Sequence, residues 1–195
     1  MGGFFGTISV KNCVSDLFYG TDYNSHLGTR RGGLAVISRE GNFVRSIHNI
    51  QNSPFRTKFE TEANTMHGKL GIGCISDFEA QPIFVRSHHG SFAIATVGKI
   101  NNIDTLVEEI IKTGTHFFEM HGGEINQTEL VAAMINQKDN FIDGITYAQQ
   151  KIDGSLSMLL LTPKGVYAAR DRFGRTPVVL GVKDDGCCAC FESFA

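Results

Sequence analysis

The amino-acid sequence predicts an α+β fold in which helices pack on mainly antiparallel sheets. Segments rich in Val, Ile and Phe fill the first half of the chain, helical apolar patterns fill the middle, and strand-like segments return in the last third. Strands and helices that occur in separate runs are typical of antiparallel sheets covered by helices. The 22 glycines, against 4 prolines, provide the tight turns that short strands require.

The first half of the chain is expected to form strands, because β-branched and aromatic residues dominate its segments and Gly, Asn or Asp separates them. The expected strands span residues 4–10, 33–38, 42–48, 69–76 and 91–97. A short helix is expected at residues 59–66, between the third and the fourth of these strands.

The middle of the chain is expected to contain three helices. The first is capped by Asn102 and stops at Gly114. Its apolar stripe, at helical spacing, consists of Ile103, Leu106, Val107, Ile110 and Ile111. The second begins at Asn126, whose side chain can cap free N–H groups while Glu129 reaches back to it. The third covers residues 141–152.

The last third is expected to return to strands, separated by turns that contain Gly. These strands span residues 155–161, 166–170, 178–182 and 187–192. Residues 1–195 are expected to form one domain. The chain stops at Ala195, where the last expected strand has just ended, which suggests the N-terminal part of a longer protein.

Composition and charge exclude several classes of function. Lys and Arg number 18 and Asp and Glu 20, which gives a net charge of −2, and no basic stripe of the kind that binds nucleic acid is visible. No apolar run is long enough to span a membrane. The 5 cysteines are irregularly spaced and no signal peptide precedes them, so we expect a reducing, cytoplasmic setting.

No metal or cofactor site is expected. The phosphate-binding and dinucleotide-binding glycine motifs are absent from the sequence. Two pairs of histidines lack the spacing and cysteine partners of zinc sites, and we interpret them as solvated loop residues. They are His88 with His89 and His116 with His121.

Two further clusters have a structural and a functional interpretation. The cysteines of residues 187–190 contain a C-x-x-C pattern, but alternate positions of a strand face opposite sides, which favours small buried apolar residues. Residues 170–175 (RDRFGR) form a charged turn that can brace the structure or bind an anion, and spacing alone favours the brace.

Seven segments, in order over nearly the whole chain, resemble class II glutamine amidotransferases. They are residues 3–8 (GFFGTI), Arg31-Gly32, residues 71–73 (GIG) followed by 79–82 (EAQP), residues 93–100 (AIATVGKI), residues 126–130 (NQTEL), residues 153–155 (DGS) with 168–177 (AARDRFGRTP), and residues 191–193 (FES). The AARDRFGRTP stretch is most similar to amidophosphoribosyltransferases, which catalyse the first committed step of purine synthesis.

The resemblance implies an N-terminal-nucleophile hydrolase fold, a four-layer αββα sandwich of two mainly antiparallel sheets. In that family, removal of Met exposes a Cys that attacks the glutamine amide, with its own α-amino group as base. An Asn side chain and a Gly N–H stabilise the oxyanion, and an Arg and an Asp hold the substrate. Ammonia then passes to a C-terminal phosphoribosyltransferase domain of the same protein. A homo-oligomer is expected, with the final strand exposing an edge that a neighbouring copy covers.

This chain differs from the family at the positions of the nucleophile, the oxyanion donor and the substrate-binding residues. Gly2 stands at the position of the nucleophile, and Val97 replaces the oxyanion Asn, although the following Gly98 is retained. Gln127 stands where the family has the substrate-binding Asp, whereas Arg31 matches. The segment that carries the substrate-binding Arg is shortened to residues 74–77, so this Arg is expected to be lost.

The expectation is therefore an amidotransferase-like domain without glutaminase activity, in a protein that uses free ammonia. One alternative is a regulatory module whose altered pocket holds another small metabolite. A second keeps hydrolase activity through another thiol, Cys74 or Cys13, and ranks last because neither is N-terminal and neither has an evident His partner.

Overall fold

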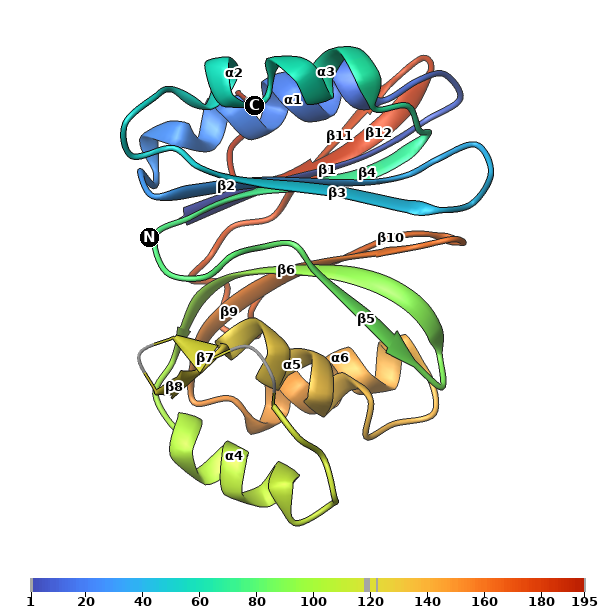
Figure 1. Cartoon of the computed structure of the whole chain (residues 1–195). Coiled ribbons are helices and arrows are strands. Elements are labelled where there is room, and N and C mark those ends of the chain that lie inside the picture. The colour runs from blue at the N-terminus through green and yellow to red at the C-terminus, as the bar shows by residue number, and fades with distance from the viewer. Residues whose placement is uncertain (1, 118–119, 122, 195) are drawn as a thin grey trace.

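Two antiparallel sheets lie face to face between two layers of helices (Figure 1). The computed structural model describes residues 2–117, 120–121 and 123–194. The first sheet contains β1 (Gly2–Ser9), β2 (Arg31–Ile37), β3 (Phe43–Asn49), β4 (Leu70–Ser76), β11 (Val179–Lys183) and β12 (Gly186–Cys190). Its strand order is β11-β12-β1-β4-β2-β3, and all its neighbouring strands are antiparallel.

The second sheet is smaller and also antiparallel. Its strands are β5 (Ile83–Ser87), β6 (Gly90–Ile100), β9 (Gly154–Thr162) and β10 (Gly165–Ala169), in the order β10-β9-β6-β5. A separate two-stranded ribbon consists of β7 (Met120–His121) and β8 (Glu124–Ile125).

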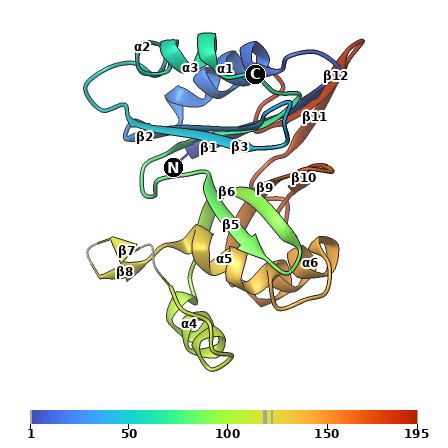
Figure 2. The same cartoon turned by 45° about the vertical axis from the view of Figure 1, so that its right-hand side comes forward.

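Helices cover the outer face of each sheet (Figures 1 and 2). Over the first sheet lie α1 (Val14–Tyr23), the 3-10 turn η1 (Asn24–His26), α2 (Phe55–Lys58) and α3 (Glu60–Thr65). Over the second sheet lie α5 (Gln127–Ile135) and α6 (Phe141–Lys151), with α4 (Ile103–Ile111) further out. The order helix, sheet, sheet, helix confirms the expected αββα sandwich. No helix in the described part of the chain is long and apolar enough to cross a membrane.

The core divides into clusters on either side of each sheet. Successive side chains of β1 point to opposite faces of its sheet and so belong to two different clusters. Phe4 is fully buried between the two sheets, whereas its neighbour Phe5 points outward beneath α1. On the adjacent β4, a Cβ at Gly73 would lie 2.0 Å from Thr21 Oγ1 of α1. The glycine therefore lets the helix pack directly on the strand backbone.

The expected elements agree with the structure except at a few boundaries. All five expected strands of the first half overlap β1, β2, β3, β4 and β6, and the three middle helices correspond to α4, α5 and α6. The expected short helix at residues 59–66 corresponds to α3, whereas the preceding short helix α2 was not expected. Helix α1 and strand β5 were not expected.

The end of the chain also differs from expectation. The last strand, β12, ends at Cys190 and lies inside the sheet between β11 and β1. The exposed edge belongs instead to β11, where Leu180 is 73% and Val182 89% exposed. An exposed apolar sheet edge is therefore present as expected, but β11 forms it and not the last strand β12.

Candidate functional site

The expected nucleophile position lies at one end of the first sheet, in a row of three neighbouring strands. Gly2 at the start of β1 pairs with Ser76 at the end of β4, and Ser76 pairs on its other side with Arg31 at the start of β2. Figure 1 marks this as the N end of the chain, on the side towards which β6 runs. The strand register thus places Gly2 and Arg31, which are 29 positions apart in sequence, on either side of Ser76.

The backbone at Gly2 is buried and closely surrounded. A Cβ added to Gly2 would lie 2.3 Å from the carbonyl oxygen of Ile75, which is a backbone atom that side-chain rotation cannot move away. A residue with a side chain at this position therefore requires β1 and β4 to shift relative to one another.

A short turn follows β4 and is held by side-chain acceptors. Ser76 Oγ accepts hydrogen bonds from the N–H groups of Phe78 and Glu79, each at 3.2 Å. Asp77 Oδ1 accepts from the N–H of Thr29 at 2.7 Å. Burial acts to raise the pKa of Asp77, but hydrogen bonds that include this one outweigh it and hold the pKa below its ordinary value. The shortened segment is thus a fixed turn tied to the residues before β2.

The second sheet contributes the other expected positions, Val97 and Gly98, near the end of β6. Val97 pairs with Ser157 of β9, and its apolar side chain packs against the cluster between the sheets. Gly98 has a φ of +148°, and a Cβ there would lie 1.9 Å from the carbonyl oxygen of Ser155. This backbone conformation and this contact both require glycine at position 98.

Glu79 connects the turn after β4 to the start of α5. Its two carboxylate oxygens accept hydrogen bonds from the N–H groups of Gln127 and Thr128 and from Thr128 Oγ1. Asn126 Oδ1 accepts from the N–H of Glu129 at 3.1 Å, as the expected cap of this helix. A negative carboxylate at the N-terminus of a helix is favourable because the helix dipole is positive there. The donors at the start of α5 are thus filled from within the protein.

A chain of polar contacts continues from α5 into the core. Thr128 Oγ1 lies 2.6 Å from Thr96 Oγ1 of β6, and the N–H of Thr96 donates to Gln81 Oε1 at 2.7 Å. Gln81 Oε1 also lies 3.8 Å from Cys74 Sγ of β4. The network links both sheets and α5, and its buried members rigidify this end of the molecule.

The sequence alone does not identify this network. Glu79 and Gln81 lie in a segment that carries the family resemblance, but the partners of Glu79 are 48 and 49 positions away and the partner of Gln81 is 15 positions away. The only local signal is the Asn126 cap, which locates the start of α5 without showing which carboxylate meets it.

The buried thiols cannot provide a nucleophile. Burial raises the pKa of Cys13 and of Cys74 to about 12, and both side chains are essentially inaccessible. Since the thiolate is the reactive form, neither is reactive at neutral pH. Burial and the raised pKa values both argue against a displaced thiol nucleophile at these two residues.

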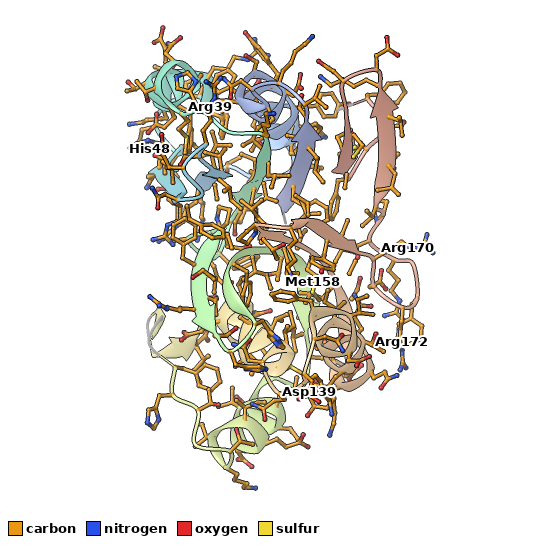
Figure 3. The ribbon with its side chains drawn as sticks, turned by 90° about the vertical axis from the view of Figure 1, so that its right-hand side faces the viewer. Arg39, His48, Asp139, Met158, Arg170 and Arg172 are labelled. Carbon is orange, nitrogen blue, oxygen red and sulfur yellow. The ribbon has the colours of Figure 1, made fainter. Side chains whose placement is uncertain are left out.

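The charged turn at residues 170–175 is a brace. Asp171 is buried, and its carboxylate accepts hydrogen bonds from the N–H and Oγ1 of Thr176, each at 2.9 Å, and from the N–H of Phe173 at 3.2 Å. Figure 3 shows Arg170 and Arg172 at the edge of the molecule. These internal hydrogen bonds hold the turn, which agrees with the interpretation as a brace.

The remaining candidate clusters are only partly as expected. Cys190 is buried, but Cys187 is exposed, so the interpretation of residues 187–190 as uniformly buried is wrong. His88 is exposed, whereas the ring of His89 stacks against Phe141 with centroids 4.9 Å apart. The side chain of His121 lies outside the described residues. Within the part that the structure describes, no three His, Cys, Asp or Glu side chains form a group that could hold a metal ion.

Comparisons with known proteins point to one family. The family model described as "Glutamine amidotransferase domain" matches residues 67–194. The amidophosphoribosyltransferase of Methanocaldococcus jannaschii is 28% identical over 191 residues, which cover 93% of this chain and 40% of the relative. The amidophosphoribosyltransferase of Rhizobium etli is 34% identical over 99% of this chain and 40% of its own length. The chain thus spans about 40% of the length of these relatives.

Solved structures show the same fold. The glutamine phosphoribosylpyrophosphate amidotransferase of B. subtilis superposes with a TM-score of 0.85 at 21% identity, over 98% of this chain and 42% of that one. A glutamine aminotransferase class-II domain protein from Silicibacter pomeroyi gives a TM-score of 0.68 at 11% identity, over 98% and 88% of the two chains.

Proposed function

This chain belongs to the glutamine amidotransferase family, and from that premise we propose that it is the N-terminal domain of an amidophosphoribosyltransferase-like protein that does not hydrolyse glutamine. The observation that carries the proposal is Gly2, which stands at the nucleophile position of the family and offers no reacting atom. Without a nucleophile, the covalent route through an acyl-enzyme is closed.

The oxyanion position supports the same conclusion. The side chain of Val97 packs in the apolar cluster between the sheets and has no hydrogen-bond donor to offer a tetrahedral intermediate. Only the backbone at Gly98 matches the family there. Removal of one oxyanion donor costs on the order of 10²–10³ in rate.

The position for the substrate ammonium has also lost its charge. Gln127 is neutral, and the nearby carboxylate of Glu79 is already engaged by three donors at the start of α5. A substrate ammonium would have to compete with these hydrogen bonds. Arg31, at the start of β2, is the remaining match to the family and by itself can only attract a carboxylate.

The role in a longer protein follows from the length of the relatives. Since this chain spans about 40% of them, we propose that a phosphoribosyltransferase domain follows it and takes ammonia from solution. Residues 1–195 would then act as a cover and scaffold for that domain.

The direct test is a glutaminase assay of the 195-residue chain. We expect no ammonia or glutamate from glutamine above the rate without protein. A glutamine-directed alkylating analogue is expected to leave the mass of the chain unchanged. Turnover above background, or a stoichiometric adduct on a residue other than the exposed Cys187, would overturn the proposal.

A further inference from the structure

A cavity of about 800 Å³ lies at the end of the first sheet opposite to Gly2. It forms where β1 and β2 end and β4 begins, and it also contacts the turn between β9 and β10. Figure 1 shows these segments together at the end of the molecule away from the N end. Its volume lies within the range of about 300–1,000 Å³ that small-molecule pockets occupy.

Three cationic side chains from three different segments line this cavity: Lys11, Arg39 and Lys69. None of its lining residues carries a carboxylate. Figure 3 looks onto this end of the molecule and shows Arg39 on it. The net charge of the chain is −2, whereas the charged residues that line this concave surface are all positive. The cavity is therefore a local positive region on a slightly negative protein.

The cations are only weakly neutralised by neighbouring groups. Among the described residues, no carboxylate lies within ion-pair distance of Arg39 or Lys69. Lys11 lies 3.5 Å from Asp185, which is closer to Lys183, at 3.1 Å. A further carboxylate beside the cavity, that of Glu40, accepts a hydrogen bond from Ser38 Oγ at 2.9 Å.

The cavity is built on fixed backbone. Asn12 Oδ1 accepts from the N–H of Gly68 at 3.0 Å, and Ser9 N–H donates to the carbonyl oxygen of Lys69 at 2.8 Å. These bonds hold the segments of Lys11 and Lys69 side by side. Helix α1 starts just beyond Asn12, and the carboxylate of Asp16 in its first turn offsets the positive end of the helix dipole there.

We propose that this cavity binds a small molecule that carries two or more phosphate groups, held by Lys11, Arg39 and Lys69. Like charges that line one hollow repel one another unless an anion neutralises them. Linked phosphates carry several negative charges on one molecule and can accept charge-assisted hydrogen bonds from more than one cation, whereas a carboxylate or a chloride carries a single charge. The site is separate from the glutamine pocket and does not rest on the loss of glutaminase activity.

Titration of the 195-residue chain with tripolyphosphate, in phosphate-free buffer, tests the proposal. Calorimetry is expected to show saturable binding, and the NMR amide signals of Val10, Gly41 and Leu70 are expected to move. Arg39→Gln and Lys69→Gln are each expected to weaken binding about tenfold, as the loss of one charge-assisted hydrogen bond implies. Lys112→Gln, which removes a cation beyond the end of α4, is the matched control and is expected to leave affinity unchanged.

The controls separate this site from general attraction of anions. Sulfate at the same ionic strength is expected to bind far more weakly, because one dianion contacts fewer of the cations. Thermal melting shows whether each variant remains folded. Absence of saturable binding, equal affinity for sulfate, or equal weakening by Lys112→Gln would overturn the proposal. Adenosine triphosphate and tripolyphosphate are compared next: signal changes at Val10 with either ligand support the site, and changes confined to other regions overturn it.

Discussion

Thr128 donates twice to a single carboxylate oxygen of Glu79: its Oγ1 lies 2.7 Å and its backbone N 3.1 Å from Oε2. Thr128 is fully buried, so these donors have no access to water. The pair joins the turn after β4 to α5, which belong to opposite halves of the sandwich. It is therefore one of the contacts that hold the two halves together at the candidate site, beside the hydrogen bond from Thr96 to Gln81.

Glu79→Ala is expected to destabilise the fold by about 1–3 kcal/mol, because a buried hydroxyl and two helix-start N–H groups lose their acceptor. Urea unfolding followed by circular dichroism measures the effect. Glu108→Ala, on the exposed side of α4, is the control and is expected to change stability by less than about 0.5 kcal/mol. Equal losses in both variants would show that Glu79 acts only as a surface charge.

The sequence identifies strands and helices well where their pattern is strong, and α1 shows where it fails. Residues 14–23 contain Gly20 and several β-branched and aromatic residues, which are poor helix formers. The helix forms because of tertiary packing: a Cβ at position 20 would lie 2.4 Å from the Phe5 ring. This contact spans the sheet and the helix layer, and no local pattern reveals it.

The candidate site shows the same division. The family resemblance locates Gly2, Arg31 and Gly98, and strand register then brings Gly2 and Arg31 together. The role of Glu79 at α5 depends on how the turn after β4 is directed. That direction follows from contacts such as the one between Asp77 and Thr29, which are distant in sequence.

Asp171 is expected to make the stability of the protein depend on acid pH. Burial acts to raise its pKa, but hydrogen bonds from Thr176 and Phe173 outweigh burial and hold the pKa below its ordinary value of about 3.9. A carboxyl whose pKa is lower in the folded state stabilises the fold above its unfolded pKa. That contribution is lost as the pH falls through the folded value.

Asp171→Asn is therefore expected to cost about 1–3 kcal/mol at pH 7, since the amide removes acceptors of a buried turn. As the pH falls below about 4, the difference between the two proteins should shrink, because the carboxyl is protonated first in the unfolded chain and then, at its lower folded pKa, in the folded protein. Unfolding free energies at pH 7 and pH 3 measure it. If the difference in unfolding free energy between the two proteins did not change with pH, the stabilisation by an ionised Asp171 would be contradicted.

The five cysteines are expected to differ sharply in reactivity. Cys187 is exposed, whereas burial raises the pKa of Cys13 and Cys74 to about 12 and that of Cys190 to about 11. Iodoacetamide at pH 7.5, a value chosen as about one unit below the ordinary thiol pKa, should label Cys187 first. Peptide mapping by mass spectrometry identifies the labelled residues, and labelling in denaturant is the control. Rapid labelling of Cys74 in the folded chain would contradict its burial.

Gly2→Cys alone is not expected to create a glutaminase. The new thiol would stand at the family's nucleophile position, but its Cβ would lie 2.3 Å from the carbonyl oxygen of Ile75 unless the strands shift. Val97 would still provide no oxyanion donor, and Gln127 no charge for the substrate ammonium. Each missing charge-assisted hydrogen bond costs roughly 1.5–3 kcal/mol, so substrate binding would also remain weak.

The measurement is ammonia release from glutamine by the Gly2→Cys chain, with removal of Met1 checked by mass spectrometry. The matched control is Gly2→Ser, which adds a side chain of similar size with a weaker nucleophile. Both variants are expected to stay at the background rate, and their melting temperatures report the strain at the start of β1. If Gly2→Cys alone reached the rates of an active amidotransferase, the pocket would have to be intact. The assignments of Val97 and Gln127 to degenerate positions would then be wrong, and the loss of activity would rest on Gly2 alone.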